Sequence, residues 1–129
     1  MFKYADTYSF DDKIIIFLSK EKDGSYKFRN IQDNTNIILN YETAFNLQKI
    51  RIPGFFYQGD SVLIKLNSGR NIRSEKNVEI KLEKGFSMKN QILNVYINES
   101  KERVYSFDIS KDHSDYAELI CKEEELILN

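Results

Sequence analysis

The amino-acid sequence is poor in the residues that hold small or metal-bound folds together. Its 129 residues include one cysteine, one histidine, one proline and no tryptophan. Cys121 cannot form a disulfide within the chain, which favours a reducing compartment. Cys121 and His113 have no second pair of ligand-type residues beside them, so we expect no metal site.

Long hydrophobic stretches are missing as well. No apolar run approaches the roughly 18 residues of a membrane helix. The first residues lack the basic start and the apolar core of a signal peptide. We therefore expect a cytoplasmic protein that has no membrane partner.

Patterns typical of enzymes are absent too. The chain has no GxGxxG and no GxxxxGK[ST] phosphate-binding loop. A Cys–His nucleophile pair would need a third, orienting group, which nothing in the sequence marks. The carboxylate clusters at 11–12 and 123–125 lie at the ends of expected elements, where acidic side chains are usually solvated. We expect a protein that is not an enzyme, with no catalytic residue and no cofactor.

The composition is that of a folded domain with an uneven charge distribution. Apolar residues make up 41% of the chain and charged residues 30%, so we expect one domain over 1–129. Residues 49–89 carry nine basic and four acidic residues, whereas the rest carries ten basic and sixteen acidic ones. A basic middle segment can present a positive face, although scattered surface charges would give the same count.

Short apolar or alternating stretches separated by turn residues indicate many β-strands. An Asp-Gly pair at 23–24 is a hairpin-turn signal. Strands are expected within 1–12, ended by Asp11-Asp12, and at 13–18, 26–31, 37–39, 61–66, 78–82, 92–97 and 104–109.

A strand that runs into a helix is expected twice. Asn40 is a strong helix N-cap after the strand 37–39, and Glu42 suits the first turn of a helix. The strand 104–109 is followed by Ser110 or Asp112 as the corresponding cap. Helices are therefore predicted over 41–51 and 112–127.

The Pro53-Gly54 pair separates these two halves of the chain. Each half then reads as four strands and a helix, which suggests pseudo-repeats at 1–52 and 55–129. The predicted fold class is α+β: an antiparallel, β-rich domain, in one version a duplicated ββββα unit with two helices. The alternative is that two strand–helix junctions look alike by chance.

Two ββββα units resemble the Whirly proteins, the positive-cofactor-four family of coactivators and the PUR-repeat proteins. The resemblance lies in the order of the elements and in the strand–cap–helix pattern shared by 37–50 and 104–120, and the Whirly signature run is missing. It implies curved antiparallel sheets that bind single-stranded nucleic acid. Such proteins stack bases on aromatic rings and hold phosphates with lysine and arginine.

The first functional hypothesis is therefore a small protein that binds single-stranded nucleic acid, DNA in the first instance, with weak sequence preference. The expected phosphate contacts include a basic loop at 67–76, and the whole candidate set is Lys27, Arg29, Lys65, Arg70, Arg73, Lys76 and Lys81, with Tyr26, Phe28, Tyr57 and Tyr96 as stacking rings. The second hypothesis is a non-enzymatic accessory factor of viral or mobile-element origin that docks on a host protein. A homo-oligomer is compatible with both.

Overall fold

The structure is a computed structural model that describes residues 2–110 and 115–128. The chain divides into two compact units, Met1–Phe55 and Phe56–Asn129, here called the first and the second unit. The division lies one residue after the Pro53-Gly54 pair. Within the part of the chain that the structure describes, no helix has the length and apolar content that crossing a membrane requires.

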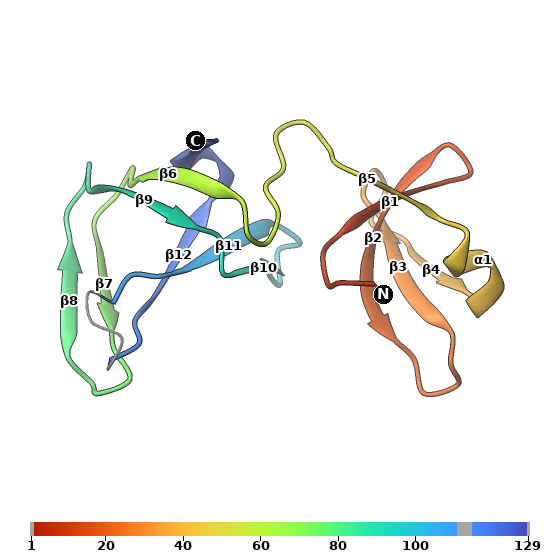
Figure 1. Cartoon of the computed structure of the whole chain (residues 1–129), viewed down its shortest axis with the longest axis horizontal. Coiled ribbons are helices and arrows are strands. Elements are labelled where there is room, and N and C mark those ends of the chain that lie inside the picture. The colour runs from red at the N-terminus through yellow and green to blue at the C-terminus, as the bar shows by residue number, and fades with distance from the viewer. Residues whose placement is uncertain (1, 111–114, 129) are drawn as a thin grey trace. The chain divides into compact units, whose positions relative to one another are not determined.

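The first unit is built on one antiparallel sheet of five strands, in the order β4-β3-β2-β1-β5 (Figure 1). Four strands follow one another as hairpins, and the fifth returns to pair with the first. The elements are β1 (Thr7–Phe10), β2 (Lys13–Lys20), β3 (Tyr26–Asn30), β4 (Asn36–Leu39), α1 (Tyr41–Phe45) and β5 (Gln48–Ile50).

Local sequence explains the hairpins of this unit. Asp11 and Asp12 have φ angles of 49° and 60°, as a two-residue hairpin turn requires. Gly24 has a φ of 90° in the predicted Asp-Gly turn, and the N–H of Ser25 donates to Asp23. In β3 the aromatic residues point into the core and the cations point away from it.

Helix α1 begins where Asn40 predicts. The Asn40 side chain accepts a hydrogen bond of 2.9 Å from the N–H of Thr43. The helix ends at Phe45, however, and Gln48–Ile50 is strand β5, paired with β1. The prediction of a helix over 41–51 is thus right for its first half. In the second half, residues 48–50 form a strand because they pair with β1.

Replacing Asn40 by alanine is expected to lower the free energy of unfolding by about 1 kcal/mol, because the Thr43 N–H loses its partner. Urea denaturation followed by circular dichroism measures this change. Asn36→Ala, at the exposed start of β4, is the control. Equal stability of the two variants would show that the cap contributes nothing.

The second unit contains three small antiparallel sheets (Figure 1). The strand orders are β10-β11-β12, β13-β6-β9 and the hairpin β7-β8. The elements are β6 (Ser61–Lys65), β7 (Arg70–Arg73), β8 (Glu79–Leu82), β9 (Ser87–Gln91), β10 (Asn94–Ile97), β11 (Arg103–Asp108), β12 (Glu118–Lys122), the 3-10 helix η1 (Glu123–Glu125) and β13 (Leu126–Leu128).

Strand β11 lies at the centre of the core of this unit. Its Tyr105 and Phe107 are fully buried. They lie opposite Cys121 and Leu119 of the neighbouring strand β12, which are also buried. Strand β6 adds two buried residues, Val62 and Ile64. Both three-stranded sheets thus bury apolar side chains.

The prediction of a helix over 112–127 is wrong for the residues that the structure describes. Residues 118–122 form β12, in which Leu119 and Cys121 point inward and Ile120 points outward. This alternation has the two-residue period of a strand, and pairing with β11 outweighs local helix preference. The expected cap Asp112 and His113 lie outside the described residues.

Two further expectations change with this correction. The second unit does not repeat the ββββα order, so the duplicated unit with two helices is not confirmed, while a mostly antiparallel β structure is. The expected basic loop 67–76 contains strand β7, which pairs with β8.

Candidate functional site

The first unit contains an open pocket of about 460 Å³ on the core face of its sheet. Five aromatic rings line most of it. The lining residues are Phe2, Tyr8, Tyr26, Tyr41, Ala44, Phe45, Leu47 and Lys49. A volume of this size is typical of pockets that hold a small ligand or a few side chains of a partner.

Alternation in the strands and the single turn of α1 together build this pocket. Tyr8 on β1 and Tyr26 on β3 point to the same face of the sheet. Tyr41 and Phe45 are four residues apart on α1, so their rings lie side by side, with centroids 4.9 Å apart. Ala44 between them is buried and anchors the helix to the core.

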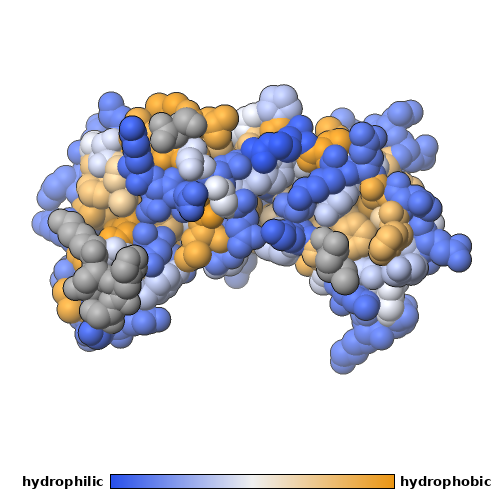
Figure 2. All heavy atoms as spheres, viewed as in Figure 1, coloured by the Kyte–Doolittle hydropathy of each residue, from blue (hydrophilic) through white to orange (hydrophobic). Residues whose placement is uncertain are grey.

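The rings at the mouth of the pocket are exposed to solvent. Phe45 is 65% exposed and Tyr41 55%. Figure 2 shows hydrophobic residues reaching the surface in this unit, which is drawn on the right. Large exposed aromatic residues beside a cavity are typical of binding surfaces, because burying them on a ligand removes apolar area from water.

One ion pair borders the pocket. The ammonium of Lys49 lies 3.0 Å from the carboxylate of Asp6. Burial raises the pKa of the Tyr8 hydroxyl, and the charge of Asp6 raises it further. The Tyr8 hydroxyl is therefore neutral at neutral pH.

The predicted nucleic-acid residues of the first unit lie on two opposite faces of β3. Phe28 is fully buried in the core, so its ring has no face free to stack on a base. Tyr26 is also buried, but it forms part of the pocket wall. Lys27 and Arg29 are half-buried on the other face, and Arg29 Nε has no hydrogen-bond partner within the described residues.

The predicted aromatic residues of the second unit differ in exposure. Tyr57 is buried, and the guanidinium of Arg103 lies 4.8 Å from the centre of its ring. Little of the Tyr57 ring is therefore open to a base. Tyr96 on β10 is 38% exposed and remains accessible.

The predicted cations of the second unit do not form one surface. Arg70 points to the opposite face of β7 from Arg73, and it donates to both carboxylate oxygens of Glu125. Arg73 and Lys81 share a face of the β7-β8 hairpin, with Glu79 opposite Arg73. Lys65 on β6 and Lys76 in the β7–β8 turn are exposed on separate elements.

Buried charges in the second unit serve its structure. Glu125 accepts hydrogen bonds from the backbone N–H groups of Asn67 and Lys122 as well as from Arg70. Burial raises the pKa of the neighbouring Cys121 thiol to about 11, and the charge of Glu125 adds to the rise. The thiol is therefore protonated at neutral pH and is a poor nucleophile.

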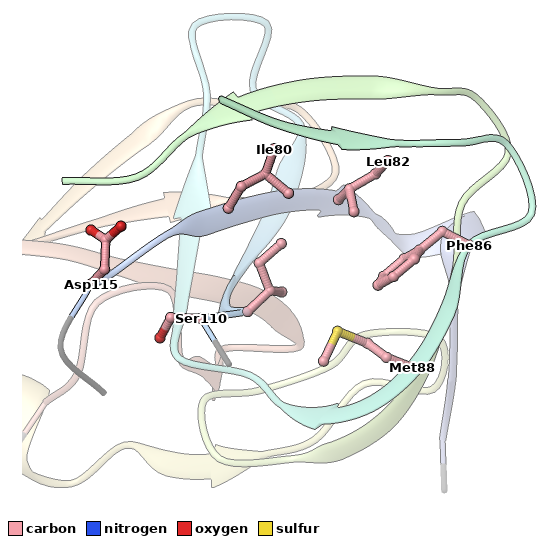
Figure 3. A pocket seen from close by; sticks show the side chains of 7 residues that line it. Ile80, Leu82, Phe86, Met88, Ser110 and Asp115 are labelled. Atoms are coloured by element: carbon pink, nitrogen blue, oxygen red, sulfur yellow. The ribbon is translucent and has the colours of Figure 1, made fainter. Parts of the chain in front are cut away.

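A second pocket, of about 320 Å³, lies in the second unit (Figure 3). Phe86 and Met88 reach into it, and Ser110 and Asp115 lie at one side. The Ser110 hydroxyl donates to Asp108 at 2.7 Å, and Asp115 accepts from the Lys76 N–H at 3.0 Å. These polar groups are engaged within the protein, so the aromatic pocket of the first unit is the stronger candidate.

Tyr26 lines this pocket and was predicted from the sequence as a stacking ring for nucleic acid, whereas Tyr41 and Phe45 were not predicted as site residues. The available signal was their spacing of four residues directly after the Asn40 cap, which places both rings on one side of a short helix. Over residues 2–110 and 115–128, no group of three or more His, Cys, Asp or Glu residues could hold a metal ion.

Comparisons with protein-family models, with curated proteins and with solved structures found no match to this chain. A function is therefore inferred from the aromatic pocket of the first unit and the charged residues beside it.

Proposed function

We propose that this chain is a non-enzymatic protein-binding module whose first unit holds an apolar side chain of a partner polypeptide. The observation that carries the proposal is the group of five aromatic rings around one open pocket. Tyrosine and other aromatic residues are enriched where proteins bind proteins, because each buries a large apolar area at little conformational cost.

The magnitudes support binding of a side chain. Burying one Leu or Phe side chain contributes about 1.5–3 kcal/mol, and favourable ring-to-ring geometry adds about 0.5–1.5 kcal/mol. The mouth rings Tyr41 and Phe45 pack on one another and need little ordering when a ligand arrives. A short segment with one or two anchors would thus bind in the weak range that is usual for peptide recognition.

Single-stranded nucleic acid has less support than a protein partner. Phe28 and Tyr57 are buried, and Arg70 is held by Glu125. The exposed pair Tyr41 and Phe45 offers ring surface to which a base could bind, but the predicted phosphate contacts of this unit, Lys27 and Arg29, lie on the opposite face of β3 from the pocket. Binding of single-stranded nucleic acid is therefore the alternative outcome of the experiment that tests this proposal.

The test is selection from a displayed peptide library on the purified chain. Peptides that bind the chain and not the variant Tyr41→Ser/Phe45→Ser are expected, with affinity reduced about tenfold or more by the double substitution. Both side chains are largely exposed, so the variant should keep its stability. Ile38→Ser, at an exposed residue that does not line the pocket, is the matched control and should bind normally.

A labelled oligothymidylate titration runs in parallel. Peptides that bind the chain and the double variant equally would contradict the pocket as the site. Oligonucleotide binding that is lost in the double variant, with no peptide selected, would replace the proposal by single-strand binding. Sedimentation of the free chain shows whether a second copy fills the pocket.

A further inference from the structure

The charges beside the aromatic pocket of the first unit indicate which partner segment it accepts. Among the described residues that line the pocket, Lys49 is the one that carries a charge. Its side chain is 60% exposed, whereas the side chain of Asp6, its ion-pair partner, is only 10% exposed. An incoming ligand therefore meets the ammonium and not the carboxylate.

A second cation lies next to the same pocket. The ammonium of Lys20 is 5.9 Å from the centre of the Tyr26 ring, and Tyr26 forms part of the pocket wall. Lys20, at the end of β2, is exposed. Two ammonium groups thus lie beside the rings from two different strands.

The acidic residue of α1 does not balance them. Glu42 is the only acidic residue in the helix, and it lies outside the pocket lining. It follows Tyr41 directly, so it projects about a quarter turn away from the face that Tyr41 and Phe45 share.

The ring geometry favours an aromatic ligand over a cationic one. Phe2 meets Tyr8 edge to face, with an interplanar angle of 76°, and meets Phe28 at 90°. An aromatic side chain could continue this edge-to-face packing. Aromatic pockets also bind ammonium groups, but Lys20 and Lys49 would repel a cation here.

We propose that the pocket binds an extended segment of a partner protein in which an aromatic side chain is flanked by Asp or Glu. The inference rests on the proposed function and names the chemistry of the partner. The aromatic ring enters the pocket, and the flanking carboxylates meet the ammonium groups of Lys20 and Lys49.

The absence of tryptophan from the chain allows a direct test. Three peptides with one central tryptophan are compared, flanked by Glu, by Gln or by Lys, and each is titrated with the intact chain. Light that tyrosine does not absorb excites only the peptide, and its emission shifts when the indole leaves water. The Glu peptide is expected to bind roughly five- to tenfold more tightly than the Lys peptide, and the difference should shrink as salt is added.

Charge variants locate the effect. Lys20→Glu and, separately, Lys49→Gln should each reduce the preference for the Glu peptide over the Lys peptide. Lys49→Gln removes the ion-pair partner of Asp6 and could therefore affect folding. Lys20 is exposed, so Lys20→Glu tests the charge effect without that risk. Lys13→Glu, the same charge change at the other end of β2, is the control.

The outcomes separate this inference from the function on which it rests. Equal binding of the Glu and Gln peptides, or tighter binding of the Lys peptide, overturns the acidic partner and leaves peptide binding in place. Binding of none of the three peptides overturns it as well, and the library selection then decides independently whether the pocket binds peptides.

Discussion

Replacing Glu125 by alanine is expected to lower the free energy of unfolding of the second unit by about 3–5 kcal/mol, because it removes the carboxylate that pairs with the partly buried Arg70 guanidinium and accepts from two backbone N–H groups. Glu125 is 2% exposed and receives hydrogen bonds from the Arg70 guanidinium and from the N–H groups of Asn67 and Lys122. One side chain therefore joins the loop between β6 and β7, the end of β12 and the guanidinium of Arg70.

The matched control is an exposed ion pair on the β7-β8 hairpin, which also carries Arg70. Arg73 and Glu79 are separated by 3.9 Å, and both side chains are more than half exposed. Glu79→Ala should therefore change stability by at most about 0.5 kcal/mol. Urea denaturation of both variants measures the difference, and a cost below about 1 kcal/mol for Glu125→Ala would show that the buried pair contributes little.

The cost of losing Glu125 should depend on pH. Burial by itself would raise the pKa of this carboxyl, but the hydrogen bonds from Arg70, Asn67 and Lys122 and the charge of Arg70 lower it below its usual value. A lowered pKa contributes stability above the ordinary glutamate pKa of about 4.3, and this contribution is lost as the pH falls toward the folded-state pKa. The stability difference between the wild-type chain and Glu125→Ala should accordingly shrink in acid.

Phe28→Ala is expected to lower the free energy of unfolding of the first unit by about 3–5 kcal/mol, as removal of a fully buried ring does. Phe28 is in ring contact with Phe2, Tyr8 and Phe17, at centroid distances of 5.4–6.0 Å. Amide hydrogen exchange resolves the loss by segment and should show it in the peptides of residues 2–55.

The same substitution at an exposed ring provides the comparison. Phe45→Ala removes a side chain that is mostly in water, and its cost should stay below about 1 kcal/mol. Together the two variants distinguish a core residue from a binding residue. A stable Phe28→Ala variant that had lost binding to a single-stranded oligonucleotide would instead support Phe28 as a stacking platform.

Local features of this fold could be predicted from sequence because their causes are local. The alternation in 26–30 places the aromatic rings inside β3, and the Asn40 side chain starts α1 through a bond to a residue three positions later. The Asp-Gly turn likewise depends on the backbone freedom of Gly24. Each of these elements is determined within a few residues.

The errors concern features whose cause lies far along the chain. Residues 118–122 are a strand because β11 pairs with them, and 48–50 are a strand because β1 does. Arg70 remains a predicted phosphate contact, and the structure pairs its guanidinium with Glu125, which is distant in sequence. The pocket shows both cases, since the spacing of Tyr41 and Phe45 is local but their meeting with Tyr8 and Tyr26 depends on the whole sheet.

The pairing of β13 with β6 has a consequence for the order in which the chain folds during its synthesis. All strands of the first unit are available once residue 50 has emerged from the ribosome, so its sheet can close early. Strand β6 has to wait for Leu126–Leu128 before its second neighbour exists. Pairing between such distant segments is slow, and the unit is most prone to aggregate while the edge of β6 is uncovered. The second unit therefore sets the pace at which the newly made protein matures.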